Sequence, residues 1–413
     1  MKRVVVTGMG MVSPLGIDVA SSWSNLIAGR SGIDRVTDFS TEGVGSKIAG
    51  QVRVPEDYRY RINAKEARRN DPFIHYALYS TAEALHDADW SPTEPEALER
   101  TGVIIGSGIG GFTTIVDGAV GFDSGGSHAL SPFFISAQLI NLASGQVAIG
   151  HGFRGPNYGV VSACSTGAEA IINAARVIKL GEADVMVVGG SDAVVHPLAM
   201  AGFDRMRALS TKFNDQPQRA SRPFDTDRDG FVIADGAGVL VLESYDHALA
   251  RGAQIHAELV GFASQSDAHH VSASHPQGAG EQLTLRNALR AASLEPAAVD
   301  YLNAHATSTP IGDSGELAAI RAVFGAGGGP AISSTKSATG HTLGAAGAIE
   351  AIFSIQAIKT GTIPGTLNLE QPDPATEGLD VVGPEPRQQP VRVALSNAFG
   401  FGSTKAAVIF AAV

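Results

Sequence analysis

Short runs of apolar residues alternate along the chain with longer segments in which apolar residues recur at helical spacing. The short runs predict buried strands, which we expect at residues 4–7, 103–106, 185–190 and 239–243. A helical pattern over residues 71–88 lies between the first two runs. Strands that alternate with helices are typical of an α/β fold with largely parallel sheets. No apolar run reaches about 18 residues, so the sequence predicts no membrane span.

The segment 158–181 combines a strand, a turn and a helix around the only cysteine of the sequence, Cys164. Residues 158–162 are expected to form a short buried strand. After the cysteine, one apolar stripe predicts a helix that ends at Gly181, and this stripe consists of Ala168, Ile171, Ile172, Ala175 and Ile178. A lone cysteine is usually a small buried residue. At the N-terminus of a helix, however, free N–H groups and the helix dipole favour a thiolate, which indicates a lowered pKa and a nucleophile.

A weak internal repeat relates the two parts of the chain. A shift of 180 residues aligns Gly167 with Gly347, and in both copies an alanine-rich helix ends at a Lys-x-Gly sequence, Lys179 to Gly181 and Lys359 to Gly361. The repeat indicates two related, βαβ-like halves, residues 1–252 and 253–413, in one compact unit.

Composition and charge exclude several classes of protein. The 413 residues can bury a large core, and 44% hydrophobic with 17% charged residues is the balance of a soluble globular protein. A net charge of −11 argues against general nucleic-acid binding. A single cysteine excludes an internal disulfide framework and fits a reducing, cytoplasmic location. The first residues are expected to form a strand rather than a signal peptide.

Two other segments could suggest a cofactor or a metal. Residues 106–111, GSGIGG, formally match the dinucleotide fingerprint, but the glycine-containing residues 112–126 predict no clear long helix, so we expect a glycine-rich turn. His269, His270 and His275 lie in a loop where no cysteine or carboxylate cluster completes a metal site. We therefore expect neither a cofactor nor a metal.

Two further histidines lie in apolar segments rich in glycine and threonine, where an imidazole is costly unless it is used. His305 belongs to NAHATSTP, residues 303–310, and His341 to KSATGHTLG, residues 336–344. These motifs, SACSTG at 162–167 and NAFGFG at 397–402 resemble those of the β-ketoacyl-[acyl-carrier-protein] synthases of the thiolase superfamily. The resemblance extends over residues 4–410, and Cys164, His305 and His341 match the Cys-His-His triad of that family.

The sequence is most similar to the type II elongating synthases, through Ile109 and the SPFF segment at 131–134. The resemblance implies a five-layered αβαβα thiolase fold, a homodimer and a fatty-acid elongation enzyme. The implied reaction is a decarboxylative Claisen condensation of acyl- with malonyl-[acyl-carrier-protein] through an acyl-Cys164 intermediate. A paralogous ketosynthase that elongates a polyketide, an aryl polyene or another specialised chain remains the alternative. A non-catalytic chain-length partner or a scaffold is disfavoured, because such partners typically lack the cysteine.

The resemblance also assigns roles around the triad. His305 and His341 would hold the enolate oxygen of the malonyl thioester, and the N–H groups of Cys164 and Phe401 would hold the second oxyanion. Phe401, between two glycines, also matches a gating phenylalanine.

Charged residues of the matched motifs are expected to support the triad. Lys336 and Glu350 would form an orienting ion pair. Asp313 and Glu316, which follow the first histidine motif, are expected to be supporting residues.

Substrate and carrier contacts are assigned in the same way. Ile109, Phe134 and Phe203 are candidate walls of an acyl tunnel, although for Phe203 an ordinary core position is the favoured interpretation. Two short basic clusters are expected to dock the acidic acyl carrier protein, and they consist of Lys65, Arg68, Arg69, Arg205 and Arg207.

Four positions depart from the usual pattern of the family. Ala306 and Ala234 replace glycines, and Ser403 and Lys405 replace the usual Gly and Asn after the Gly-Phe-Gly sequence. A β-carbon at Ala306 and a charge at Lys405 leave the triad intact but put chain-length preference and turnover in question.

Overall fold

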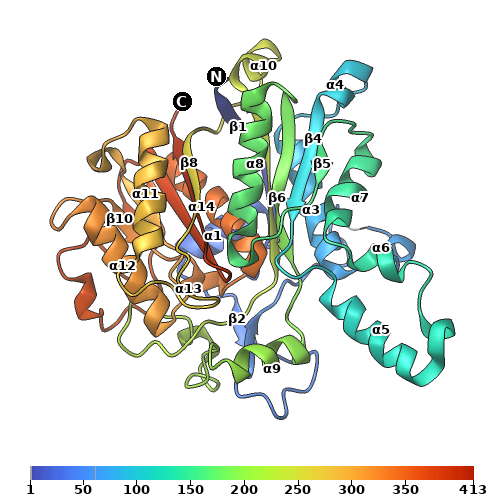
Figure 1. Cartoon of the computed structure of the whole chain (residues 1–413), viewed down its shortest axis with the longest axis horizontal. Helices are drawn as coiled ribbons and strands as arrows, with labels where there is room; N and C mark the ends of the chain where they lie inside the picture. The colour runs from blue at the N-terminus through green and yellow to red at the C-terminus, as the bar shows by residue number, and fades with distance from the viewer. Residues whose placement is uncertain (1, 61) are drawn as a thin grey trace.

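The computed structural model describes residues 2–60 and 62–413, and these residues build one large sheet covered by helices (Figure 1). The sheet has ten strands in the order β10-β9-β13-β14-β8-β1-β7-β6-β4-β5. Five of them come from the first part of the chain: β1 (Val4–Val12), β4 (Thr101–Gly106), β5 (Asn157–Tyr158), β6 (Val185–Asp192) and β7 (Gly236–Ser244). Five come from the second part: β8 (Ala257–Ser266), β9 (Tyr301–Asn303), β10 (Ala331–Ser333), β13 (Val393–Gly400) and β14 (Thr404–Ala411).

The strand order is symmetric about the junction of β1 with β8. Reading outward from that junction, β1-β7-β6-β4-β5 on one side corresponds to β8-β14-β13-β9-β10 on the other. The outer strands pair in parallel and the inner strands are antiparallel. The expectation of largely parallel sheets is therefore wrong for the inner strands. β13 and β14, for example, are joined by a turn of only three residues, and a turn that short allows only antiparallel pairing.

Helices form three layers around the strands. α8 (Thr166–Leu180) and α14 (Ala346–Thr360) contact strands of both halves and lie in the centre, while α3 (Pro72–Asp87) and α7 (Asn141–His151) cover the first half. α11 (Ala279–Ala292) contacts β8, β14 and α12 (Pro310–Phe324) on the other side of the molecule (Figure 1). The two halves of the sheet lie on either side of α8 and α14, so the layers follow the αβαβα order expected for the fold. The division at residues 252 and 253 stays a prediction.

The central helices approach closely because small residues line their contact. Each begins after a 3-10 turn, η2 (Ala163–Ser165) or η5 (Leu343–Ala345), and the first residues of these turns have the same positive φ of 49°. The predicted stripe on α8 is buried as expected, and Gly181 ends the helix in the left-handed conformation. Gly361 ends α14 in the same way.

Shorter elements complete the fold. The helices are α1 (Val19–Ile27), α2 (Ala64–Ala67), α4 (Pro95–Glu99), α5 (Phe112–Gly125), α6 (Phe134–Gln138), α9 (Pro197–Arg205), α10 (Tyr245–Ala250) and α13 (Lys336–Thr339). Two small antiparallel pairs join β2 (Ile33–Arg35) to β3 (Ile48–Gly50) and β11 (Thr362–Ile363) to β12 (Arg387–Gln388). Across residues 2–60 and 62–413, no helix has the length and apolar character needed to cross a membrane.

Candidate active site

Cys164 lies in η2, immediately before the N-terminus of α8. Thr166 holds this turn together, because its hydroxyl accepts the N–H of Ser162 at 2.9 Å and donates to the carbonyl of Ala163 at 2.7 Å. Ala163 has a φ of +49°, a strained conformation for a residue with a β-carbon. The turn therefore presents the cysteine at a fixed angle to the helix axis.

The strand expected before the cysteine is mostly absent. Among the described residues, β5 comprises only Asn157 and Tyr158, which pair with Val103 and Ile104 of β4 and are exposed. Residues 159–162 then leave the sheet, because the N–H of Ser162 binds the Thr166 hydroxyl rather than a neighbouring strand. The prediction of a buried strand at 158–162 was wrong beyond Tyr158.

The expectation of a lowered thiol pKa is also corrected. Burial raises the pKa of Cys164 to about 12, while the charge of Lys336 and the backbone N–H groups of Phe401 and Cys164 act in the opposite direction. Desolvation wins because the thiol is surrounded mainly by protein. The side chain of Cys164 is thus a neutral thiol at rest, and backbone N–H donors lie beside its sulfur.

His305 follows β9 in a loop that a buried carboxylate fixes. Glu316 of α12 accepts the backbone N–H of His305 at 2.9 Å and that of Ala306 at 2.7 Å, and it also accepts Nδ2 of Asn397 at 2.9 Å. Burial raises the pKa of Glu316 and outweighs the opposite effect of these donors, so its pKa is about 7. The β-carbon at Ala306 is accommodated in the core, where this residue is buried.

Asp313, one turn before Glu316 on α12, holds the remainder of the same loop. Its carboxylate accepts the backbone N–H of Ser308 at 3.1 Å and that of Phe224 at 3.0 Å, and Arg228 lies 3.7 Å away. Burial raises the pKa of Asp313 to about 6. Asp313 and Glu316 thus act on the backbone around His305, as supporting residues would.

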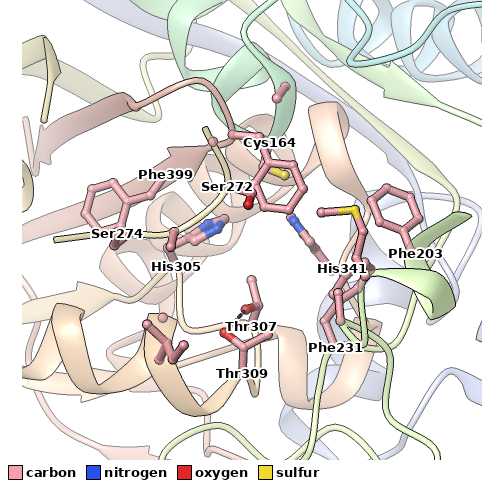
Figure 2. Close-up of a pocket in the computed structure, with 18 of the residues that line it drawn as sticks. Cys164, Phe203, Phe231, Ser272, Ser274, His305, Thr307, Thr309, His341 and Phe399 are labelled. Carbon is pink, nitrogen blue, oxygen red and sulfur yellow. Dashed lines mark hydrogen bonds between the residues drawn. The ribbon is translucent and has the colours of Figure 1, made fainter. Parts of the chain in front are cut away.

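His341 comes from the loop between α13 and η5, and its side chain points at the same cavity as His305 and Cys164 (Figure 2). Its backbone N–H donates to the carbonyl of Val232 at 2.8 Å. The two imidazole rings are 5.3 Å apart, centre to centre, and nearly perpendicular at 84°. Nδ1 of His305 and both ring nitrogens of His341 are buried and have no hydrogen-bond partner among the described residues.

Both imidazoles are held neutral. Burial lowers the pKa of His305 and of His341 well below 6.5, and the charge of Lys336 adds to the effect on each ring. A neutral imidazole carries one N–H donor and one acceptor nitrogen. Buried, unpartnered polar atoms are rare and costly in proteins, so these nitrogens are available for a ligand in the cavity.

Lys336 and Glu350 lie beneath the cavity rather than in its wall. They form a buried ion pair between the start of α13 and α14. Burial raises the pKa of Glu350 and outweighs the opposite effect of the Lys336 charge, so its pKa is about 7. Because the same charge acts on Cys164, His305 and His341, the lysine is an electrostatic neighbour of all three reactive groups.

The three reactive residues share one cavity of about 590 Å³. Of the residues expected in an acyl tunnel, Ile109 and Phe203 line this cavity, and Phe203 packs edge-on against Phe231 at 5.3 Å. Phe134 does not line it. Phe134 starts α6 and packs against Gly118 of α5 instead.

Sequence reasoning missed several cavity residues. The rings of Phe399 and His305 are 5.7 Å apart, centre to centre. Thr307 and Thr309 lie across the cavity from Cys164, with their hydroxyls 3.1 Å apart (Figure 2). Ser272 and Ser274 line the cavity from the loop 267–278. The first three lie within motifs quoted for their histidine or phenylalanine, so their places in those motifs were the available signal. The serines carried no local signal.

The two basic clusters lie on separate elements. Lys65 is in α2, and Arg68 and Arg69 follow that helix directly, where Arg69 lies over the ring of Phe133 at 4.7 Å. Arg205 ends α9, and Arg207, two residues later, lines the cavity.

The glycine-rich segment 106–111 forms the expected turn, but a helix follows it. α5 spans Phe112–Gly125, so the expectation of no long helix there was wrong. Tertiary packing overrides the low helix propensity of its glycines, since Gly118 makes room for Phe134. The N–H groups of Gly108 and Ile109 bind the buried carboxylate of Asp192, at 3.0 and 3.4 Å. These donors are therefore already used within the protein.

Residues 1–248 match the β-ketoacyl synthase N-terminal domain, and residues 256–370 match the β-ketoacyl synthase C-terminal domain. The chain belongs to the β-ketoacyl synthase family. This synthase is 49% identical to the mitochondrial 3-oxoacyl-[acyl-carrier-protein] synthase of Arabidopsis thaliana, over 100% of this chain and 94% of that protein. It is 48% identical to 3-oxoacyl-[acyl-carrier-protein] synthase 2 of Rhizobium meliloti (strain 1021), over 99% of this chain and 98% of the relative.

A solved structure supports the fold of the synthase. A type II polyketide ketosynthase, in complex with its acyl-carrier protein and bound to the hexaketide, superposes with a TM-score of 0.91 at 32% identity, with 100% of both chains covered. The family, the thiolase-like fold and the enzyme class predicted from the sequence are confirmed by these matches. No group of three or more His, Cys, Asp or Glu side chains that could hold a metal occurs in the described part of the chain.

Proposed function

We propose that the synthase elongates acyl chains by condensing acyl- with malonyl-[acyl-carrier-protein], and that Cys164 carries the acyl group between the two half-reactions. In the first, Sγ of Cys164 attacks the thioester carbonyl of the acyl-carrier. The carbon–sulfur bond to the carrier breaks, and the proton from the Cys164 thiol ends on the departing carrier thiol. The products are acyl-Cys164 and free carrier, with no net proton change.

In the second half-reaction, malonyl-carrier loses CO₂ and leaves an enolate. We assign the stabilisation of its oxygen to His305 and His341, each of which can donate one N–H into the cavity. The carbanion attacks the acyl-Cys164 carbonyl, a carbon–carbon bond forms, and the bond from this carbonyl to the Cys164 sulfur breaks. The thiolate then takes up one proton from solvent, so each condensation consumes one proton and releases one CO₂. The observation that carries this proposal is a pair of neutral imidazoles whose buried, unpartnered ring nitrogens lie in the cavity of the only cysteine.

The oxyanion on the acyl carbonyl requires separate donors. The N–H groups of Cys164 and Phe401 are the candidates, because both act on the cysteine sulfur in this geometry. Lys336 with Glu350 would set the electrostatic potential, and Asp313 with Glu316 would hold the His305 loop. We assign these four residues to positioning rather than to proton transfer.

The substrate and the carrier would enter from the exposed side of the cavity. Ile109 and Phe203 are the proposed acyl-chain walls. The polyketide ketosynthase described above was solved with its carrier protein, which supports the same kind of partner here. Lys65, Arg68 and Arg69 on one side and Arg205 and Arg207 on the other would attract an acidic carrier despite the net charge of −11.

We also propose that the chain works as a homodimer. β5 is an edge strand of the sheet, and α7, α6 and α5 follow one another in contact outward from it. These helices and the residues after β5 carry exposed apolar side chains: Val120, Phe122, Ile135, Ile149 and Val161. An apolar face of this kind marks an interaction site. Phe134, which does not reach the cavity of its own chain, belongs to this region, and a role in the acyl tunnel would depend on the second copy. A cytoplasmic location and two functional halves divided at residues 252 and 253 complete the proposal.

A specialised acyl chain is the second candidate. It is favoured by the structural likeness to a polyketide ketosynthase. The mechanism would be the same, and only the length and chemistry of the acyl group would differ.

Intact-mass measurement tests both candidates. The protein is incubated with acyl-carriers of different chain lengths, each with and without malonyl-carrier, beside a Cys164→Ala control. We expect a mass increase equal to the acyl group that is absent from the control and is discharged by malonyl-carrier into a β-ketoacyl product. Acylation by no fatty acyl-carrier but by polyketide intermediates would favour the second candidate. Acylation of the Cys164→Ala variant would overturn the assignment of the nucleophile.

A further inference from the structure

Lys405, a charged residue where the family usually has asparagine, is buried in the wall of the active-site cavity. It lies near the start of β14 and is 2% exposed. Its Nζ lies 3.0 Å from Oδ2 of Asp267 and 3.7 Å from Oε1 of Glu281. Asp267 belongs to the loop that follows β8, and Glu281 to the first turn of α11. One ammonium group therefore connects three separate elements.

The three side chains do not balance in charge. Two carboxylates face one lysine, and both Oδ2 of Asp267 and Oε2 of Glu281 are buried without a hydrogen-bond partner in the described part of the chain, so Lys405 contacts Asp267 as an ion pair. Burial raises the pKa of Asp267, but the hydroxyl of Ser403 and the charge of Lys405 outweigh burial and keep this pKa below its usual value. Asp267 is thus the carboxylate that Lys405 holds most directly.

The contact joins the turn 400–404 to the loop 267–275. The N–H of Gly402 donates to the carbonyl of Val271 at 2.8 Å, and the N–H of Asp267 donates to the carbonyl of Ser403 at 3.2 Å. The Ser403 hydroxyl donates to the carbonyl of His270 at 3.3 Å. Residues 270–274 and Phe401 line the cavity, so the two joined segments form one continuous part of its wall.

The same turn touches the nucleophile on its other side. The hydroxyl of Thr404 donates to the carbonyl of Ser162 at 3.1 Å. A β-carbon on Gly400 would lie 3.1 Å from the backbone nitrogen of Cys164. Any displacement of the turn therefore moves the N–H of Phe401 relative to the cysteine sulfur.

We propose that Lys405 is a positioning residue, which ties the turn 400–404 to the loop 267–275 through Asp267 and thereby fixes Phe401 against Cys164. The Lys405 charge also contributes to the lowered pKa of His305, but the proposed positioning of the turn acts through Asp267. The catalytic consequence rests on the proposed function, whereas the mechanical coupling does not.

Two matched variants separate this role from general stability. Asp267→Asn and Glu281→Gln each remove one buried negative charge from the same cluster. Asp267→Asn leaves Glu281 as the only charged partner of Lys405 and so removes the ion pair between the turn and the loop, although their backbone hydrogen bonds remain. Glu281→Gln leaves the 3.0 Å contact between Lys405 and Asp267 intact. The readout is hydrogen exchange by mass spectrometry of peptides that cover residues 267–275 and 400–404, with no substrate present.

We expect Asp267→Asn to accelerate exchange in both peptides by about tenfold, because their mutual backbone hydrogen bonds open locally, and Glu281→Gln to change it by less than about twofold. Equal effects of the two variants, or no effect of either, would overturn the proposal. If Asp267→Asn does not fold, the wild type still decides. At alkaline pH, amide hydrogen exchange in the wild type measures the rate at which each segment opens. Residues 267–275 and 400–404 should open at one common rate. Two different opening rates would contradict the coupling.

Activity provides a second readout. In single-turnover acylation, Asp267→Asn should slow thioester formation at Cys164 by about tenfold, since a small misplacement of a catalytic donor has an effect of this order. The concentration of acyl-carrier that gives half the maximal rate should stay within about twofold, because the docking arginines are untouched. A wild-type protein that no acyl-carrier acylates would refute the proposed function and leave the exchange result standing.

Discussion

Gly167 of α8 packs directly against the backbone of Ala348 in α14, and Gly347 packs in the same way against Ala168. A β-carbon on Gly167 would lie 2.7 Å from the nitrogen of Ala348, and one on Gly347 would lie 2.6 Å from the nitrogen of Ala168. The 180-residue repeat aligns Gly167 with Gly347 and Ala168 with Ala348, so it relates one contact to the other, and the helices meet at equivalent points of the two halves. These contacts set how close η2, which carries Cys164, lies to η5, the equivalent turn of the second half.

We expect Gly167→Ala to destabilise the protein by about 1 to 3 kcal/mol, because the backbone of α14 has to move to admit the methyl group. Urea unfolding followed by circular dichroism measures the change. Gly202→Ala in α9 is the matched control, since a β-carbon there meets nothing within 4 Å. The control should be neutral or up to about 1 kcal/mol more stable. Equal changes in the free energy of unfolding for the two variants would show that the contact between α8 and α14 has room for a methyl group.

Much of the fold could be predicted because it depends on local patterns in the sequence. The stripe on α8 and the glycine that ends it depend on local spacing, and both were found from the sequence. Residues 159–162 and α5 were misjudged because their structure depends on individual side-chain contacts that the hydrophobic pattern does not show. The N–H of Ser162 binds a side chain of the following turn, and the glycines of α5 are tolerated because Gly118 receives the ring of Phe134.

The site was predictable to a similar extent. Cys164, His305 and His341 were recognised from motifs, and the structure brings them into one cavity. The pKa of the thiol could not be judged, because helix position was visible in the sequence and burial was not. The pairing of Lys405 with Asp267 and Glu281 was equally hidden, since it joins residues on three elements.

Replacing His341 by alanine should separate the two half-reactions. We expect the condensation rate to fall by about 10² to 10³, the effect of removing one oxyanion donor, with acylation of Cys164 by acyl-carrier largely retained. Stability should change by less than about 1 kcal/mol, because neither ring nitrogen has a hydrogen-bond partner to lose in the described structure. Single-turnover kinetics with acylated enzyme and malonyl-carrier give the rate.

Phe231→Leu is the control for this substitution. It removes the edge-on contact with His341, whose rings are 5.5 Å apart, but leaves the imidazole in place. Its effect on condensation should stay below about tenfold. If His341→Ala slows acylation as much as condensation, the histidine does not act in the malonyl half-reaction.

Condensation should be insensitive to mild acid. Burial lowers the pKa of both His305 and His341 well below 6.5, so the two rings take up protons only at a pH well below that value and remain neutral above it. The imidazoles should therefore cause no change in the single-turnover condensation rate between about pH 6 and pH 8, and any change there should be absent from Glu316→Gln or Glu350→Gln, because the pKa of each of these carboxyls is about 7. An acidic limb with a midpoint near 6.5 that persists in both variants would contradict neutral imidazoles in the free enzyme.

Asp235 should make stability depend on pH. Its carboxylate accepts the N–H groups of Val194 and Val195 at 2.7 and 2.9 Å, but burial raises its pKa from 3.8 to about 7. At a pH between these two pKa values, Asp235 has released its proton in the unfolded chain and keeps it in the folded chain. The folded state therefore loses stability as the pH rises from about 4 to 7, by roughly 4 kcal/mol in total.

Asp235→Asn keeps an oxygen acceptor and removes the titration. The stability of this variant relative to the wild type should increase by about 2 to 3 kcal/mol between pH 5 and pH 7.5 and then level off. Urea unfolding at several pH values provides the measurement. Parallel stability curves for the two proteins would show that Asp235 is already ionised at pH 5.

Charge reversal at Arg68 and Arg69 tests carrier docking. Both follow α2, and attraction to an acidic carrier would act mainly on association and weaken with added salt. We expect Arg68→Glu/Arg69→Glu to raise the KM for acyl-carrier by about tenfold at low salt, to leave kcat nearly unchanged, and to differ less from the wild type at about 0.5 M salt. The paired control is Arg286→Glu/Arg290→Glu on α11, which reverses the same number of charges on another element. A general effect of net charge would raise KM equally in both double variants, whereas docking at the α2 cluster raises it only in the first.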